Sequence, residues 1–282
     1  MAECGVLYMV ATPIGNLEDM TYRAVRILSE ADLIAAEDTR GSIKLLNHFN
    51  IHTPMTSYHE YNKVAKAKTL VEAVLGGKNV ACITDAGTPG ISDPGEVLVK
   101  MAMDNGITVV PVPGACAVVN ALVCSGQDTR RFCFEAFLPA DKKERDAILE
   151  ELKDETRTIV LYEAPHRLAR TLDLLAQTLG DRPVTICREL TKKHEEFRRT
   201  TIEDAAGWYQ EHEPRGEFVL VIAGRDRGEL IRQQQEEIRE AVSLEEHMKQ
   251  YLDKGLDRRE AMKAVAKDRG MTKREVYRQL LQ

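Results

Sequence analysis

The sequence predicts an α/β protein with two lobes and a small C-terminal helical domain, and three observations support this class. Short apolar runs alternate with amphipathic segments, a pattern typical of α/β proteins with much parallel strand pairing. The strand-then-helix alternation restarts after Pro113–Gly114, which divides the α/β part in two. The last segment of the chain contains three short stretches that each begin with a helix-capping pattern.

These observations set the predicted domain boundaries. Residues 1–113 form the N-terminal α/β lobe, and residues 114–224 form the C-terminal α/β lobe. Residues 225–242 are too polar to contribute a core, so we interpret them as an exposed linker or linker helix. Residues 243–282 form a basic helical tail domain, which is too short for a self-sufficient core.

Apolar runs of strand length and helical periodicity between them define the individual elements. The predicted strands cover 6–11, 33–37, 80–84, 108–112, 132–138, 158–163, 184–189 and 217–224. The predicted helices cover 22–31, 62–75, 95–104, 142–153 and 168–179. In the tail, the capping boxes that predict helix starts are Ser243–Glu246, Asp257–Glu260 and Thr272–Glu275.

Composition and charge limit the class of protein. The chain has 282 residues, 43% of them hydrophobic, which is enough for a sizeable core. It has no apolar run of membrane-spanning length and no signal-peptide pattern, so we expect a cytoplasmic protein without a membrane segment. The six cysteines form no C-x-x-C pair, which favours a reducing compartment and disfavours a structural zinc site.

The charge is unevenly distributed along the chain. The net charge is −6, yet residues 249–282 carry ten Lys and Arg against five Asp and Glu. This local excess suggests a polyanionic partner, and a solvated helical face remains an equal alternative.

The most specific pattern in the chain is Thr84–Gly95, TDAGTPGISDPG, which directly follows a predicted buried strand. Its three glycines lack Cβ atoms, so a small molecule can lie close to the main chain. Ligands of parallel α/β sheets bind where strands end, so we interpret this loop as a cofactor site. Asp93–Pro94 has the pattern of a helix N-cap and first helical residue, whereas Asp85 is free to face a ligand.

Other strand ends carry further candidates. The first strand is followed by TPIGN, which lacks the G-x-G-x-x-G pattern, so an ordinary dinucleotide-binding fold is disfavoured. The chain also has no G-x-x-x-x-G-K-[ST] motif, which argues against ATP or GTP hydrolysis.

The second strand ends in AEDTR, whose Glu37, Asp38 and Arg40 form either a structural ion pair or a functional group. In LYEAPHR, Pro165 suits a first helical position, and a cation in the first turn opposes the helix dipole. This local violation favours substrate binding by Arg167 over a surface role.

Basic residues in and around Cys187–Thr201 are candidates for one positive rim on an otherwise acidic protein. They are Lys192, Lys193, His194, Arg198 and Arg199, together with Arg130, Arg131, Lys142, Lys143 and Arg167.

Six motifs in this order resemble the ribosomal RNA small-subunit methyltransferase I family, which belongs to the tetrapyrrole-methylase fold class. They are ATPIGNLEDMTYRAV, LIAAEDTR, TDAGTPGISDPG, PVPGACA, LYEAPHR and CRELTKKHEE. The resemblance covers about residues 6–224, and the basic tail is similar to the family's C-terminal extension. It implies a two-lobed class III methyltransferase fold that binds S-adenosylmethionine between the lobes, usually as a homodimer. It further implies 2′-O-methylation of a cytidine ribose in the decoding region of 16S rRNA, on the small ribosomal subunit.

The resemblance implies the residues near the cofactor, and the chemistry of the reaction and the basic residues of the chain supply the catalytic and RNA-binding candidates. Those near the cofactor are Pro13, Ile14, Asp85, Ala86, Gly87, Cys116, Ala117, Glu163 and Leu190. Catalytic candidates are Glu37, Asp38, Arg40, Glu163 and His166, and Glu189 is a further candidate general base. Candidate RNA-binding residues are Arg167, Lys192, Lys193, Arg198, Arg199, Arg258, Arg259, Lys273 and Arg274. The reaction requires no metal, and no ligand cluster in the sequence predicts one.

Two alternatives remain at this point. One is a tetrapyrrole (precorrin-type) methyltransferase on the same fold, which typically carries G-x-G-x-G where this chain has TPIGN. The other is a non-catalytic RNA-binding assembly factor. The basic tail disfavours the first, and the complete set of cofactor-loop motifs disfavours the second.

Overall fold

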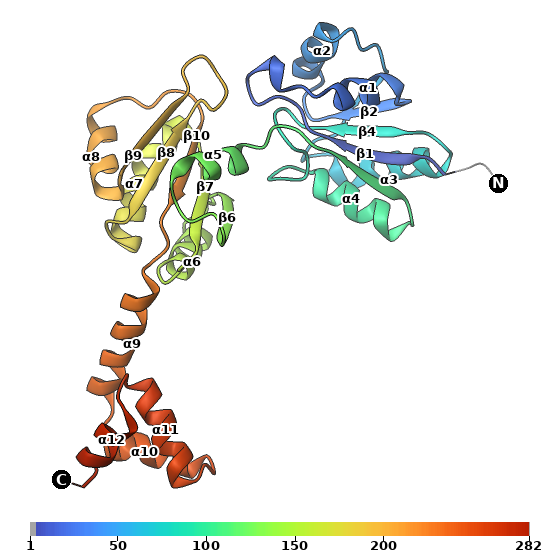
Figure 1. Ribbon diagram of the computed structural model, residues 1–282. Helices are drawn as coiled ribbons and strands as arrows, with labels where there is room; N and C mark the ends of the chain where they lie inside the picture. Colours follow the sequence, from blue (N-terminus) through green and yellow to red (C-terminus); the bar gives the residue numbers. More distant parts are fainter. Residues whose placement is uncertain (1–3, 282) are drawn as a thin grey trace.

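The first lobe is a parallel sheet covered by helices on both faces (Figure 1). The structure is a computed structural model that describes residues 4–281. The strand order is β3-β2-β4-β1-β5, and every pairing is parallel. The strands are β1 (Val6–Val10), β2 (Leu33–Ala36), β3 (Met55–Ser57), β4 (Val80–Ile83) and β5 (Thr108–Val112). The helices are α1 (Tyr22–Glu30), α2 (Thr39–His48), α3 (Lys63–Leu75) and α4 (Gly95–Asp104), with a short 3-10 turn, η1 (Leu17–Asp19).

Two apolar layers hold this lobe together. Leu70 of α3 and Leu98 of α4 are buried in one cluster with strand residues, and Leu28 of α1 and Leu46 of α2 are buried in the other. Burial of each such side chain stabilises the fold by about 1.5–3 kcal/mol. Helices cover both faces of the sheet, so polar groups are accessible mainly at the ends of the strands, where the loops begin.

The second lobe is a mixed sheet, which corrects the predicted parallel pattern. Its order is β6-β7-β10-β8-β9, and only the pairing of β6 with β7 is parallel among the described residues. The strands are β6 (Phe132–Phe137), β7 (Thr158–Glu163), β8 (Pro183–Arg188), β9 (Glu196–Thr201) and β10 (Phe218–Ile222). The last strand enters between β7 and β8 in the opposite direction. An apolar run has the same composition in either direction, so the sequence pattern did not reveal this.

Helices cover both faces of the second sheet as well. They are α5 (Ala117–Ser125), α6 (Lys142–Leu152), α7 (Pro165–Leu179) and α8 (Ile202–Glu211). The core cluster of α6, α7 and α8 includes Leu149, Leu168 and Ile202, whereas α5 packs its Ala121 and Leu122 in a separate cluster. The predicted boundary between residues 113 and 114 lies between β5 and α5.

The tail consists of α9 (Arg227–Ala241), α10 (Leu244–Asp253), α11 (Arg258–Asp268) and α12 (Lys273–Gln279). Ser243, Asp257 and Thr272 each form the reciprocal hydrogen bonds of a capping box, as the sequence predicts. A small apolar cluster including Met248, Val265 and Val276 holds α10 to α12 together. None of the fifteen residues of α9, all of them described, is buried, and this helix extends away from the second lobe (Figure 1).

The predicted range 1–113 begins, and the predicted range 243–282 ends, at residues outside the described part, namely 1–3 and 282. Among residues 4–281, no helix has both the length and the apolar character that a membrane crossing requires.

Candidate functional site

The first and third strand-end loops of the first lobe are tied to each other. Thr12 N–H donates to Gly87 O at 2.9 Å, and Gly87 N–H donates to Thr12 O at 3.1 Å. Gly87 has a φ of +86°, and a Cβ atom there would lie 3.1 Å from Ile14 Cγ2. Thr88 Oγ1 donates to Ala115 O at 3.0 Å, which anchors the loop at the start of the second lobe. Hydrogen bonds to main-chain groups of both lobes therefore hold this loop in place.

The TDAGTPGISDPG loop is also ordered from within. The carboxylate of Asp93 accepts N–H bonds from Gly90 at 2.8 and 2.9 Å and from Gly95 at 2.7 Å. Tyr58 O–H donates to Pro94 O at 2.7 Å. Helix α4 begins at Gly95 with Pro94 at the N-cap position, so the predicted N-cap at Asp93 is wrong by one residue. Asp93 still satisfies helix and loop N–H groups, which accounts for it structurally.

A cavity of about 560 Å³ lies where this loop meets the second lobe. This volume is within the usual range for small-molecule sites. The first-lobe lining comprises Ile14, Glu37, Thr84, Asp85, Ala86, Gly87, Thr88, Ile91, Ser92 and Asp93. The second-lobe lining comprises Cys116, Ala117, Phe137, Tyr162, Glu163, Ala164, Pro165, Glu217, Phe218 and Val219.

Most of the cofactor residues expected from the resemblance line this cavity. The exceptions are Pro13 and Leu190. Both are buried, and Leu190 belongs to the same apolar cluster as Ile14. The cavity therefore combines main-chain groups of the loop with an apolar wall from the second lobe.

The carboxylates of the first lobe have distinct environments. Glu37 lines the cavity, and its Oε2 accepts the hydroxyl hydrogen of Thr84 at 2.7 Å. Asp85 Oδ1 accepts the N–H of Asp38 at 2.9 Å. Asp38 caps α2, and the N–H of Arg40 is the main cause that lowers the pKa of its carboxyl group. Asp38 and Arg40 do not line the cavity, so Glu37 is the member of AEDTR that reaches it.

The charged residues of the second-lobe wall have partners within the protein. Glu163 is 2% exposed, and its carboxylate accepts the N–H of Ala164 at 2.8 Å and the hydroxyl hydrogen of Thr171 at 2.5 Å. Arg167 lies 3.4 Å from Glu163 and donates to Leu138 O at 2.5 Å. His166 is exposed in the first turn of α7 and is not among the cavity residues.

Sequence reasoning missed the aromatic part of this wall. Tyr162 accepts the N–H of Val118 at 3.0 Å, and burial raises the pKa of its phenol to about 12. The rings of Phe134 and Phe137 pack edge-on against Tyr162, with centroid distances of 4.9 and 5.6 Å. Phe137 and Tyr162 belong to predicted strands, but no sequence signal showed which side of each strand faces the cavity.

Several predicted rim residues have internal partners. Lys192 Nζ bonds Glu189 at 2.9 Å and Glu217 at 2.8 Å, and its side chain packs against Gly15 of the first lobe. Arg199 donates to backbone carbonyls at the end of α5. Arg198 lies over the Trp208 ring, 3.8 Å from its centroid. In this group Lys193, His194 and Arg199 are exposed.

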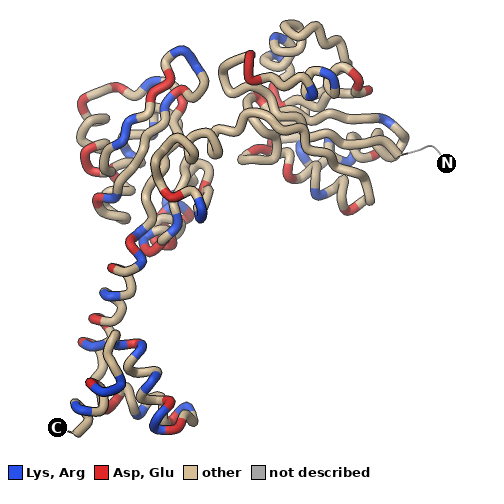
Figure 2. Tube along the Cα trace, viewed as in Figure 1, with Lys and Arg blue, Asp and Glu red and all other residues tan. Residues whose placement is uncertain are grey.

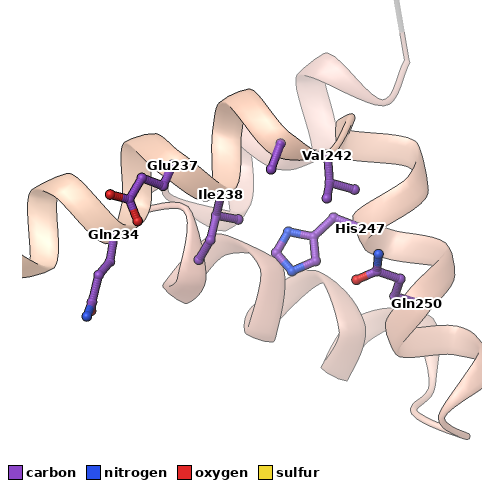
Figure 3. A pocket seen from close by; sticks show the side chains of 7 residues that line it. Gln234, Glu237, Ile238, Val242, His247 and Gln250 are labelled. Atoms are coloured by element: carbon purple, nitrogen blue, oxygen red, sulfur yellow. The ribbon is translucent and has the colours of Figure 1, made fainter. Parts of the chain in front are cut away.

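A second cavity, of about 450 Å³, lies in the tail between α9 and α10 (Figure 3). Ile238, Val242 and His247 lie together on its inner side. It is remote from the strand ends where ligands of α/β sheets bind, so the cavity between the lobes is the candidate active site. Among residues 4–281, no group of His, Cys, Asp and Glu has metal-ligand geometry.

Comparison with known proteins agrees with this fold. The family model for Tetrapyrrole (Corrin/Porphyrin) Methylases matches residues 6–206. Diphthine synthase has a TM-score of 0.62 at 13% identity, over 78% of this chain and 90% of that chain. Uroporphyrin-III C-methyltransferase from Thermus thermophilus, complexed with S-adenosyl homocysteine, has a TM-score of 0.53 at 19% identity, over 77% and 92%. The chain belongs to the tetrapyrrole methylase family, and the enzyme is an S-adenosylmethionine-dependent methyltransferase.

The sequence relatives define the branch. Ribosomal RNA small subunit methyltransferase I of Halalkalibacterium halodurans is 50% identical over 97% of this chain and 93% of its own length. The protein of the same name in Bacillus subtilis is 48% identical over 98% and 94%, and that in Synechocystis is 46% identical over 97% and 96%. Within the tetrapyrrole methylases, the chain therefore belongs to the ribosomal RNA small subunit methyltransferase I family.

The residues of the cavity fit S-adenosylmethionine. Gly87 leaves the main chain of the loop open, because a Cβ there would occupy the space beside Ile14. Asp85 places a carboxylate where a hydroxyl or amino group of the cofactor finds an acceptor. Ile14, Phe137 and Tyr162 supply apolar surface for a planar base.

Proposed function

We propose that this enzyme methylates the 2′ oxygen of a cytidine ribose in 16S rRNA, within the small ribosomal subunit in the cytoplasm. The observation that carries the proposal is the 46–50% identity to proteins named for small-subunit rRNA, which extends over the lobes and the basic tail alike. Solved uroporphyrin-III and cobalt precorrin-4 methyltransferases are 17–21% identical to this chain and cover 77–78% of it. This difference favours the RNA substrate over a tetrapyrrole.

When bound, S-adenosylmethionine supplies a methyl group activated by its sulfonium sulfur. The protein's part is to align the accepting oxygen and to assist its deprotonation. Among the candidate bases, Asp38 caps a helix, Glu163 is buried against Arg167, and Glu189 pairs with Lys192. Glu37 has a single hydroxyl donor and lines the cavity, so we assign it as the base.

The RNA-binding surface that we propose centres on the tail. Lys and Arg positions, blue in Figure 2, recur along α11 and α12, and most of these residues are exposed. The exposed ones are Arg258, Arg259, Lys263, Lys267, Lys273, Arg274 and Arg278. Arg269 is different, because it is buried and bonds His247 and main-chain carbonyls at the end of α9. The exposed residues are free to contact phosphates, whose binding weakens steeply as salt rises.

A single assay tests the proposed reaction. The protein is incubated with methyl-labelled S-adenosylmethionine and small subunits from a strain that lacks this methylation. We expect label in 16S rRNA that, after nuclease digestion, is recovered as 2′-O-methylcytidine. Label in another nucleoside, or transfer to a porphyrinoid in place of RNA, would refute the proposal. RNA binding without any transfer would instead favour the non-catalytic assembly factor.

We further propose that the enzyme is a homodimer joined through α5 and the edge strand β6. Val119 and Val123 of α5 are 48% and 62% exposed, and Phe132 of β6 is 40% exposed. Exposed large apolar side chains on neighbouring elements are typical of protein–protein interaction surfaces.

Light scattering after size-exclusion chromatography tests the dimer. The expected mass of the native protein is twice the 31.7 kDa of the chain. Val123→Glu should shift it to the monomer, because the interface would then contain an unpaired charge. Val64→Glu, at a similarly exposed position on α3 (56% against 62%), should leave the mass unchanged. A monomeric native protein would contradict this assignment.

A further inference from the structure

A small pocket in the second lobe lies beside the cofactor cavity and has no role in the site described above. Its volume is about 200 Å³. The lining comes from β8, β9, α8 and the segment leading into β10, and consists of Arg188, Glu196, Arg198, Trp208, Tyr209, His212, Glu213, Pro214, Arg215 and Phe218. Phe218, the first residue of β10, also lines the cofactor cavity. The two hollows therefore adjoin at the same end of the second sheet.

The aromatic part of this pocket is a flat stack built on Trp208. The guanidinium of Arg198 lies 3.8 Å from the centroid of the Trp208 ring. The imidazole of His212 stacks on the ring at 3.6 Å with an interplanar angle of 3°. Trp208 is 41% exposed and is the single tryptophan of the chain. An exposed stack of planar groups is the kind of surface on which unpaired RNA bases stack.

The polar part of the pocket is rich in hydrogen-bond donors. Arg188 donates to Arg215 O at 2.6 Å and to Glu196 at 3.3 Å, and Arg215 donates to Glu213 at 2.8 Å. Each guanidinium has more N–H groups than these bonds use. The lining contains three arginines and two glutamates, so its net charge is positive. Guanidinium N–H groups that have no partner within the protein can donate to the oxygens of a phosphate.

We propose that this pocket binds one nucleotide of the RNA strand next to the methylated nucleotide. The phosphate is held by Arg188 and Arg215, and the base extends the stack on the exposed imidazole of His212. This inference rests on the proposed function and adds to it a fixed contact beside the reacting ribose. Contacts of this type position the strand, so their loss weakens substrate binding more than it slows the chemical step.

The single tryptophan makes the pocket directly observable. A single-stranded ribo-octanucleotide of mixed sequence is titrated against the protein without S-adenosylmethionine, and Trp208 fluorescence is recorded. We expect a saturable change. Arg215→Gln should weaken the affinity by about fivefold to tenfold and lower the slope of log affinity against log salt by about one. Arg170→Gln is the matched control, because Arg170 is an exposed arginine of α7 outside the pocket linings.

A second measurement separates this inference from the proposed reaction. With small subunits as substrate, Arg215→Gln should raise KM by a similar factor and leave kcat unchanged. Normal methylation by the native protein, with no fluorescence response to RNA and an unaltered KM in Arg215→Gln, would overturn the pocket and leave the reaction intact. An RNA-specific fluorescence change in a protein that methylates no RNA would support the pocket and refute the reaction. An equal response to poly-L-glutamate would overturn the nucleotide assignment, because any polyanion would then suffice.

Discussion

Replacement of Glu37 by glutamine is expected to lower kcat by about 10²- to 10⁴-fold. The amide cannot accept a proton from the ribose hydroxyl, whereas its carbonyl oxygen can still accept the Thr84 hydroxyl at the 2.7 Å contact seen here. The loop and the fold should therefore persist. The affinity for S-adenosylmethionine, measured by calorimetry, should change by less than about threefold, because a hydrogen-bond acceptor remains in place.

Steady-state methylation of small subunits, with kcat and KM determined separately, measures this effect. Glu96→Gln is the control, because Glu96 is an exposed carboxylate of α4 in the same lobe. A loss of cofactor affinity at nearly normal kcat would show instead that Glu37 holds the cofactor. In that case alignment of the substrate would be sufficient for the reaction, without a dedicated base.

Replacement of Gly87 by valine is expected to weaken S-adenosylmethionine binding by about tenfold to a hundredfold. Gly87 has a φ of +86°, and its added Cβ would lie 3.1 Å from Ile14 and 3.5 Å from Ala115 O. Overpacking of this kind typically costs about 1–3 kcal/mol, and about 1.4 kcal/mol corresponds to tenfold in affinity. Because Gly87 and Ile14 both line the cavity, displacement of either one changes the binding surface.

A control variant must show whether backbone strain at a positive φ, without the contact to Ile14, also weakens cofactor binding. Gly106 also has a positive φ, of +70°, but an added Cβ there meets nothing within 4 Å. Gly106→Val should therefore lower the melting temperature through strain and leave the cofactor affinity unchanged. Equal loss of affinity in both variants would mean that the loop contact with Ile14 has no special part in binding.

The sequence predicted the elements whose burial leaves a clear hydrophobic pattern. All strands that it predicted from apolar runs are present, and the three tail helices begin at their predicted caps. It missed β3, which has three residues, and β9, whose EFRRTT is polar because it forms a sheet edge. It also missed α2 and α8. Strand direction in the second sheet depends on pairing between distant segments, and local composition does not encode it.

The candidate site was predictable where one loop supplies several groups. The loop from Thr84 to Gly95 lines the cavity as expected, because glycines and a strand end mark it locally. Cys116, Ala117 and Glu163 of the opposite wall were among the expected residues, but the rest of that wall was not predictable, because Tyr162 and Glu217 come together only after β10 inserts beside β7. The same limit applies to Lys192, whose acidic partner Glu217 is far away in sequence.

The exposed helix α9 sets the distance between two binding regions of one molecule. Fifteen helical residues span about 22 Å, so the basic tail is held well away from the second lobe. In the proposed function, the tail binds one segment of a large RNA and the cavity between the lobes then meets a second segment at a high effective concentration, so that two weak contacts act together. A folded rRNA spans both regions, whereas an isolated nucleoside or a short fragment spans only one. Selectivity for RNA within the small ribosomal subunit would then come from the length of α9, without any additional contact to the target base.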